Sequence, residues 1–232
     1  MNQNLNSFQQ PKLSPPSNLY RLAPSRTPWE PYKATSFEQR FDDPERNYFV
    51  LYASSSRLGC FVECLAYFRA DPNKPGFAEL QDKFGNSFPE GSIPPNWFRD
   101  RFVQNAEVTG SFADIAGSEW LACLLKNFPE ELKPGLAYPW LDQSTIYQDK
   151  SRAITHWISR FVFDNGENLA GIYYTSKLGS NFPNWAVFEE RAHISTLGLL
   201  QAVNEYDADL LGACALLGLN LPTAAMRLPA AS

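Results

Sequence analysis

Glu63 is the residue whose sequence setting points most clearly to chemistry. It is the only charged residue between Arg57 and Arg69. At 100° per residue this stretch predicts a helix with an apolar stripe on one side, and Glu63 falls on the other side among small and aromatic residues. A carboxylate in such a place is costly unless it is paired or hydrogen-bonded. We therefore expect Glu63 either to form a structural ion pair, with Arg21 or Arg40, or to line a cleft where its charge is used.

The thiols and imidazoles do not form a recognisable metal or nucleophile motif. The four cysteines are Cys60, Cys64, Cys123 and Cys214. They contain no Cys-x-x-Cys pair, and neither His156 nor His193 completes a ligand spacing with them. We expect buried free thiols and no metal site. The sequence also lacks a nucleophile elbow and a glycine-rich phosphate loop, so phosphate binding would have to depend on side chains.

Composition excludes some classes of protein. The net charge of −5 and the isoelectric point near 5.1 argue against a nucleic-acid-binding protein, which needs a basic face. No apolar run approaches the roughly 18 residues of a membrane span, and the polar N-terminus does not resemble a secretory signal. We expect a cytoplasmic protein that binds neither nucleic acid nor membrane directly.

The elements that must position Glu63 are predicted from its flanks. The β-branched and aromatic run at 48–53 predicts a central strand, and the serines at 54–56 are candidate N-caps for a helix that reaches about residue 69. Further expected elements are strands at 19–22 and 106–110, helices at 118–125 and from 145 or 149 to 163, strands at 171–176 and 184–188, and a Leu/Ala-rich helix within 197–221. The pattern is mixed and lacks a regular βαβ rhythm.

We expect three regions along the chain. Residues 1–18 form a flexible Pro-rich arm, residues 19–196 a single folded domain, and residues 197–232 a helical tail packed on that domain.

Several short pieces of the sequence together resemble one family. In order, they are Tyr20-Arg21, Arg40-Phe41, Leu51-Tyr52-Ala53, Glu63-Cys64-Leu65, and Gly171-Ile172 with Tyr174 and Ser176. This succession, followed by 184–188, is similar to the RES domain, which is named for its Arg, Glu and Ser. The resemblance implies an α+β fold like that of ADP-ribosyltransferases, with a split, bent mixed β-core, flanking helices and NAD+ held in a cleft.

The resemblance also implies an activity. RES domains cleave the nicotinamide–ribose bond of NAD+ with phosphate or water, as NAD+ phosphorylases or glycohydrolases, so NAD+ is a substrate and no cofactor is expected. Many are toxins that a helix-turn-helix antitoxin neutralises. Two alternatives stay open: an ADP-ribosyltransferase that modifies a protein, and a non-catalytic interaction module that retains the fold.

The chemistry assigns a task to each matching residue. Breaking this bond develops positive charge on the ribose, which Glu63 would stabilise, and arginines suit the pyrophosphate because they donate in pairs and stay charged. Tyr52 would stack on nicotinamide, although core packing explains it equally well. The expected catalytic residues are Glu63, Arg40 and Tyr52, and the expected substrate-binding residues are Tyr20, Arg21, Tyr174, Ser176 and Asn184.

Overall fold

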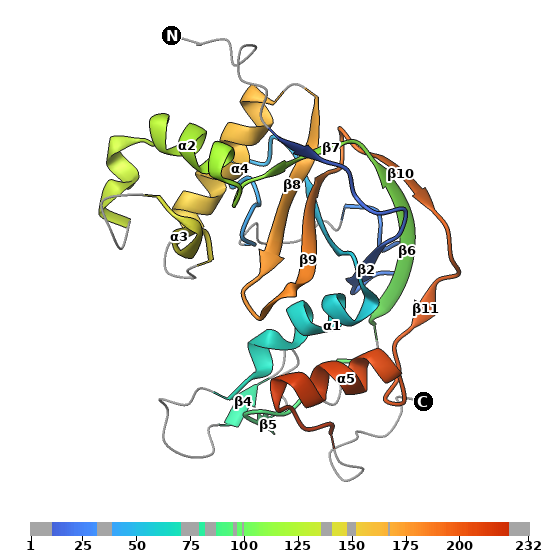
Figure 1. Ribbon diagram of the computed structural model, residues 1–232. Helices are drawn as coiled ribbons and strands as arrows, with labels where there is room; N and C mark the ends of the chain where they lie inside the picture. Colours follow the sequence, from blue (N-terminus) through green and yellow to red (C-terminus); the bar gives the residue numbers. More distant parts are fainter. Residues whose placement is uncertain are drawn as a thin grey trace.

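A strongly curled β-sheet forms the centre of the computed structural model (Figure 1). The structure describes residues 11–31, 39–70, 79–81, 87–94, 97–98, 100–135, 141–147, 152–166 and 168–222. The nine-stranded sheet has the order β1-β7-β8-β9-β3-β2-β6-β10, with β11 also paired to β6. Its strands are β1 (Lys12–Leu13), β2 (Leu19–Ala23), β3 (Val50–Ser54), β6 (Phe102–Thr109), β7 (Ser111–Asp114), β8 (Leu169–Ser176), β9 (Gly179–Phe188), β10 (His193–Thr196) and β11 (Gln201–Ala202).

The sheet is split between β2 and β3. These two strands share one paired position, Tyr20 with Ser54, whereas β3 pairs with β9 over five positions and β2 with β6 over five. One half is therefore β1-β7-β8-β9-β3, and the other is β2-β6-β10 with β11. The pair β7–β8 is parallel and the remaining pairs are antiparallel. The predicted α+β class, with a split, bent mixed β-core and flanking helices, is confirmed.

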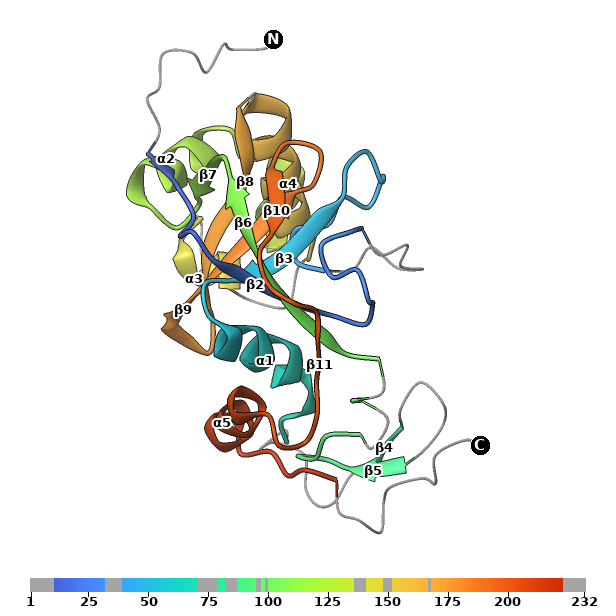
Figure 2. The same ribbon diagram turned by 90° about the vertical axis from the view of Figure 1, so that its right-hand side faces the viewer.

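The helices lie in two groups at different ends of the sheet (Figures 1 and 2). The first group consists of α2 (Ser118–Lys126), α3 (Gln143–Tyr147) and α4 (Arg152–Asn165), which pack near β7 and β8. The second consists of α1 (Arg57–Leu65) and α5 (Ala208–Leu217), near the small hairpin of β4 (Glu79–Gln81) and β5 (Ser87–Pro89). Of the helix predicted from 145 or 149 to 163, the structure describes α3 and α4, and residues 148–151 lie outside the described ranges.

Helix α1 begins where the sequence predicts. Ser56 is its N-cap, and its Oγ accepts a hydrogen bond of 3.0 Å from the Gly59 N–H. A Cβ atom on Gly59 would lie 2.3 Å from Oγ of Ser54, so glycine lets the helix start tightly against the end of β3. The helix narrows to a 3₁₀ turn over Ala66–Phe68. This arrangement fixes the first turns of the helix that carries Glu63.

The arm expected to be flexible over residues 1–18 joins the sheet in part. Residues 1–10 lie outside the described ranges, but Lys12 and Leu13 pair with Ala113 and Phe112 of β7. The indole N–H of Trp120 also donates to the Pro11 carbonyl at 3.1 Å. The edge of β7 offers main-chain groups that residues 12–13 satisfy, and the flexible arm over residues 1–18 stays a prediction.

The expected tail contains helix α5, which packs on α1. Leu210, Ala213 and Cys214 of α5 are buried in one core cluster with Phe61 and Leu65. The N-termini of the two helices are joined by a salt bridge, in which Nη1 and Nη2 of Arg57 contact both carboxylate oxygens of Asp207. The division into arm, domain and tail stays a prediction.

Candidate active site

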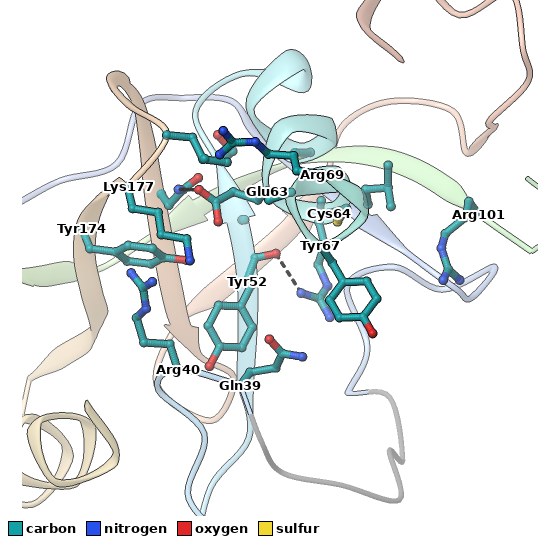
Figure 3. A pocket seen from close by; sticks show the side chains of 18 of the residues that line it. Gln39, Arg40, Tyr52, Glu63, Cys64, Tyr67, Arg69, Arg101, Tyr174 and Lys177 are labelled. Atoms are coloured by element: carbon teal, nitrogen blue, oxygen red, sulfur yellow. Dashed lines mark hydrogen bonds between the residues drawn. The ribbon is translucent and has the colours of Figure 1, made fainter. Parts of the chain in front are cut away.

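A cavity of about 870 Å³ lies where the two halves of the sheet meet α1. Its wall takes residues from β2 on one side of the split and from β3, β8 and β9 on the other. Helix α1 closes it along one side (Figure 3). The cavity is thus formed by segments that are far apart in the sequence and meet only in the folded chain.

Glu63 points from α1 into this cavity (Figure 3). Its Oε1 accepts a hydrogen bond of 3.0 Å from Nδ2 of Asn184, a buried residue of β9. The side of α1 that bears Glu63 is not buried in protein as expected, because Cys64 is exposed and Tyr67 is 79% exposed, and both line the cavity. Of the two settings considered for Glu63, the structure shows the cleft.

Arg21 is held in the cavity wall by main-chain carbonyls. Its Nη1 donates to the Tyr52 carbonyl at 2.8 Å, and its Nε donates to the Pro28 carbonyl. Burial lowers the pKa of its guanidinium, which opposing nearby groups only partly restore. The two carbonyls take two of the five N–H groups of the side chain, so three are not used by these contacts.

Tyr52 belongs to a network that shapes the segment before β3. Its hydroxyl donates to Oδ1 of Asp42 at 2.9 Å and accepts from the Phe41 N–H at 2.8 Å. The Asp42 Oδ2 accepts from the Gln39 N–H at 2.9 Å. Burial, and then the Asp42 carboxylate, raise the pKa of Tyr52 well above its ordinary value, so the phenol stays protonated. The network fixes residues 39–42 and with them the position of Arg40.

Arg40 and Tyr174 form another part of the cavity wall. The Arg40 guanidinium carbon lies 5.8 Å from the centre of the Tyr174 ring, a cation–π distance. Burial, followed by the nearby Glu63 carboxylate, raises the pKa of the Tyr174 hydroxyl, which is therefore neutral at physiological pH. Two protonated tyrosines, Tyr52 and Tyr174, thus stand in the same cavity as one carboxylate.

Positive charge dominates the described lining. The cationic lining residues are Arg21, Arg40, Arg69, Arg101, Arg152 and Lys177. Glu63 is the one carboxylate that the described part of the lining contains. A cavity with this balance, in a chain whose net charge is −5, attracts anionic ligands and can place a negative charge opposite a cationic centre.

Comparisons with known proteins agree with this architecture. A family model described as the RES domain matches residues 18–201. The chain belongs to the RES domain family. A solved structure entitled "Crystal structure of the M.tuberculosis MbcT-MbcA toxin-antitoxin complex" contains a chain with a similar fold, at a TM-score of 0.50 and 11% identity, over 89% of this chain and 91% of that one. A comparison with curated proteins finds no match.

The structure of this RES domain brings together six of the eight expected site residues. Those that line the cavity are Glu63, Arg40, Tyr52, Arg21, Tyr174 and Asn184.

Tyr20 and Ser176 are not among the lining residues. Tyr20 precedes Arg21 on β2 and therefore faces the other side of the strand; its carbonyl accepts a hydrogen bond from the Cys60 thiol at 2.9 Å. Ser176 is buried, and its Oγ accepts from the Leu178 N–H at 3.0 Å. A contact of either side chain with substrate is therefore not supported. Ser176 instead shapes the β8–β9 turn that carries Lys177 to the cavity.

Four cationic residues of the site were missed in the sequence. Lys177 directly follows Ser176 of the RES resemblance, so its position was a usable signal. Arg69 directly follows the 3₁₀ turn, Arg101 directly precedes β6, and Arg152 is the first residue of α4. No local pattern in the sequence marks these three residues.

Two further observations concern the described residues alone. They contain no group of three His, Cys, Asp or Glu side chains that could hold a metal ion. Among them, no helix is long and apolar enough to cross a bilayer.

Proposed function

We propose that this RES domain cleaves the nicotinamide–ribose bond of NAD+, with phosphate or water as the acceptor, and serves as the toxin of a toxin–antitoxin pair. The observation that carries the catalytic part is the Glu63 carboxylate. It projects into a large cationic cavity and is oriented by the buried amide of Asn184. A volume of about 870 Å³ lies within the range of pockets that enclose small-molecule ligands.

The proposed reaction places a fixed negative charge where positive charge develops. The bond between the ribose carbon and the pyridinium nitrogen breaks, and its electron pair stays on nitrogen, so nicotinamide leaves as a neutral molecule without needing a proton. The ribose then carries oxocarbenium-like charge, which the Glu63 carboxylate stabilises. A phosphate or water oxygen forms the new bond to the same carbon, and water releases a proton on doing so.

The other residues of the site support binding of a dinucleotide. The N–H groups of Arg21 that remain unused by carbonyls, together with Arg40, suit the pyrophosphate, which arginine binds in a paired geometry. The rings of Tyr52 and Tyr174 offer flat surfaces for nicotinamide. Because hydrogen bonds hold the Tyr52 hydroxyl, its ring is already in position before substrate binds.

The toxin role is supported by the family and by the similar structure, whose title names a toxin–antitoxin complex. We propose an antitoxin partner of the helix-turn-helix kind. Expression of the chain alone should arrest growth and deplete cellular NAD+, and the Glu63→Gln variant should do neither. Growth arrest by an equally abundant Glu63→Gln variant would contradict a toxin that acts through this cavity.

The decisive experiment measures nicotinamide release from NAD+ by the purified chain, with and without phosphate. Glu63→Gln keeps the shape of the side chain and removes its charge, so we expect release to fall by about 10²–10³-fold, as for the loss of one preorganised electrostatic contact. Glu107→Gln, at an exposed position of β6 outside the cavity, is the matched control and should be unchanged.

The other outcomes discriminate between the alternatives. Undiminished release by a folded Glu63→Gln protein would refute the role of the carboxylate. Transfer of labelled ADP-ribose to a protein would favour a transferase. Absence of release under all conditions would favour a non-catalytic module.

A further inference from the structure

The cavity extends well beyond Glu63. Figure 3 shows Arg101 on one side of Cys64 and Tyr67, whereas Tyr174 and Lys177 lie on the opposite side. Trp97 also lines the cavity. We call the part formed by Trp97 and Arg101 the distal end, because Arg101 lies apart from Glu63 and Tyr174 (Figure 3).

The distal end combines an aromatic ring with positive charge. The Arg101 guanidinium carbon lies 5.5 Å from the centre of the Trp97 ring, and Nη1 of Arg101 contacts Oδ1 of Asp100 at 3.3 Å. The Asp100 side chain is 40% exposed, so its neutralising effect is screened by solvent. The charge of Arg101 also acts inside the cavity, where it opposes the rise in the pKa of the Cys64 thiol.

This charge exceeds what NAD+ requires. NAD+ carries two negative charges on its pyrophosphate and one positive charge on its pyridinium ring. Arg21 and Arg40, near Tyr52 and Tyr174, can serve the pyrophosphate. In Rossmann-type dinucleotide sites, a carboxylate on the ribose 2′-hydroxyl selects NAD+, whereas an arginine accommodates the 2′-phosphate of NADP+, and the same chemistry applies to any site that meets this phosphate. Among the described lining residues, the distal end contains Arg101 and no carboxylate.

We propose that the cavity accepts a 2′-phosphorylated nicotinamide dinucleotide, NADP+, as a substrate, with its 2′-phosphate bound by Arg101 at the distal end. This inference rests on the proposed function and extends its substrate class. The bond that breaks, the neutral nicotinamide that leaves and the acceptor oxygen are the same as for NAD+. The 2′-phosphate takes no part in the chemistry, so it acts on binding.

The test compares kcat/KM for NADP+ and NAD+ in the wild type and in Arg101→Gln. We expect the wild type to use NADP+ at least as efficiently as NAD+. Arg101→Gln should lower kcat/KM for NADP+ by about tenfold or more, chiefly through KM, since a hydrogen bond to a charged group contributes about that factor. The value for NAD+ should change less than about threefold. Lys126→Gln, an exposed residue of α2, makes the same change in net charge and should alter neither substrate.

An inorganic phosphate ion is the other anion that the distal end could bind. Two further measurements distinguish it from the 2′-phosphate of NADP+. Adenosine 2′,5′-bisphosphate should inhibit NAD+ cleavage more strongly than AMP does, and Arg101→Gln should abolish the difference. The KM for inorganic phosphate, measured with NAD+, should not change in Arg101→Gln. A rise in that KM with no effect on NADP+ would overturn the proposal.

Failure of this inference is distinct from failure of the proposed function. Efficient cleavage of NAD+ with more than tenfold weaker use of NADP+ would overturn the inference and leave the proposed function intact. An equal loss for both substrates in Arg101→Gln would also overturn it. Cleavage of neither dinucleotide by the wild type would refute both.

Discussion

The ion pair between Arg57 and Asp207 ties α5 to the start of the helix that carries Glu63, and its removal gives a measurable prediction. The Asp207 side chain is 7% exposed and contacts Arg57 through both carboxylate oxygens. It is also the N-cap of α5, where it accepts from the N–H groups of Asp209 and Leu210. One residue thus holds both the ion pair and the helix cap.

The magnitude follows from these two roles. Charged hydrogen bonds contribute about 1.5–3 kcal/mol and an N-cap about 1 kcal/mol, so Asp207→Ala should lower the free energy of unfolding by about 3 kcal/mol. Asp207→Asn keeps a capping oxygen and should lower it by about 2 kcal/mol. Asp209→Asn removes a single contact of a 39% exposed carboxylate and should cost about 0.5 kcal/mol.

Urea denaturation measures all three changes, as shifts of the midpoint at constant slope. If Asp207→Ala were no more destabilising than Asp209→Asn, the ion pair and cap would not stabilise the junction and the reasoning would be refuted. A changed slope would instead show that the variant alters the surface exposed on unfolding, and the comparison would then have to be repeated by calorimetry.

The same pair predicts a pH dependence. Burial pushes the pKa of Asp207 up, but hydrogen bonds from Arg57 and from the main chain outweigh it, so the pKa lies below the ordinary value of 3.8. A lowered pKa in the folded state stabilises the protein above the unfolded value and loses this contribution as pH falls through the folded value. The stability difference between wild type and Asp207→Asn should therefore be constant near neutrality and shrink below about pH 4.

Three other predictions concern the cavity. Asn184→Leu removes the amide that orients Glu63 and should lower kcat for nicotinamide release about tenfold. The midpoint of urea denaturation should change little. Tyr52→Phe leaves the buried Asp42 carboxyl without its hydroxyl donor and should lower the free energy of unfolding by about 1–3 kcal/mol in urea. The protein surroundings raise the pKa of Cys64 to about 11, so at pH 8 iodoacetamide should alkylate it more slowly in the native than in the unfolded protein, as followed by mass spectrometry. Equal rates in the two states would contradict the last prediction.

Local patterns in the sequence predicted the elements that carry Glu63 and much of the cavity wall. The apolar run before Ser54 became β3, Ser56 became the cap of α1, and the strands at 171–176 and 184–188 became parts of β8 and β9. These features depend on neighbouring residues, which is why a single sequence reveals them. The two-residue strand β1 was missed because Lys12 and Leu13 offer no alternation, and only the edge of β7 makes them a strand.

Two expected site residues, Tyr20 and Ser176, lie outside the cavity lining for physical reasons. The alternation of side chains along a strand could have excluded Tyr20, since Arg21 was already assigned to the cavity. Ser176 is two residues from Tyr174 and would share its face in a regular strand, but the register shifts between Thr175 and Ser176. Such a shift depends on how β8 meets β9 and leaves no mark in the sequence. The distal arginine Arg101 was unpredictable for a similar reason, because only the tertiary fold brings it beside α1.

The single paired position between β2 and β3 has a consequence for how the protein responds to its ligand. Arg21 stands on one side of that joint and Asn184 on the other, so a molecule filling the cavity touches both halves of the sheet at once. A ligand in the cavity would contact both sides of this single paired position. Its binding free energy would then oppose local separation of β2 from β3.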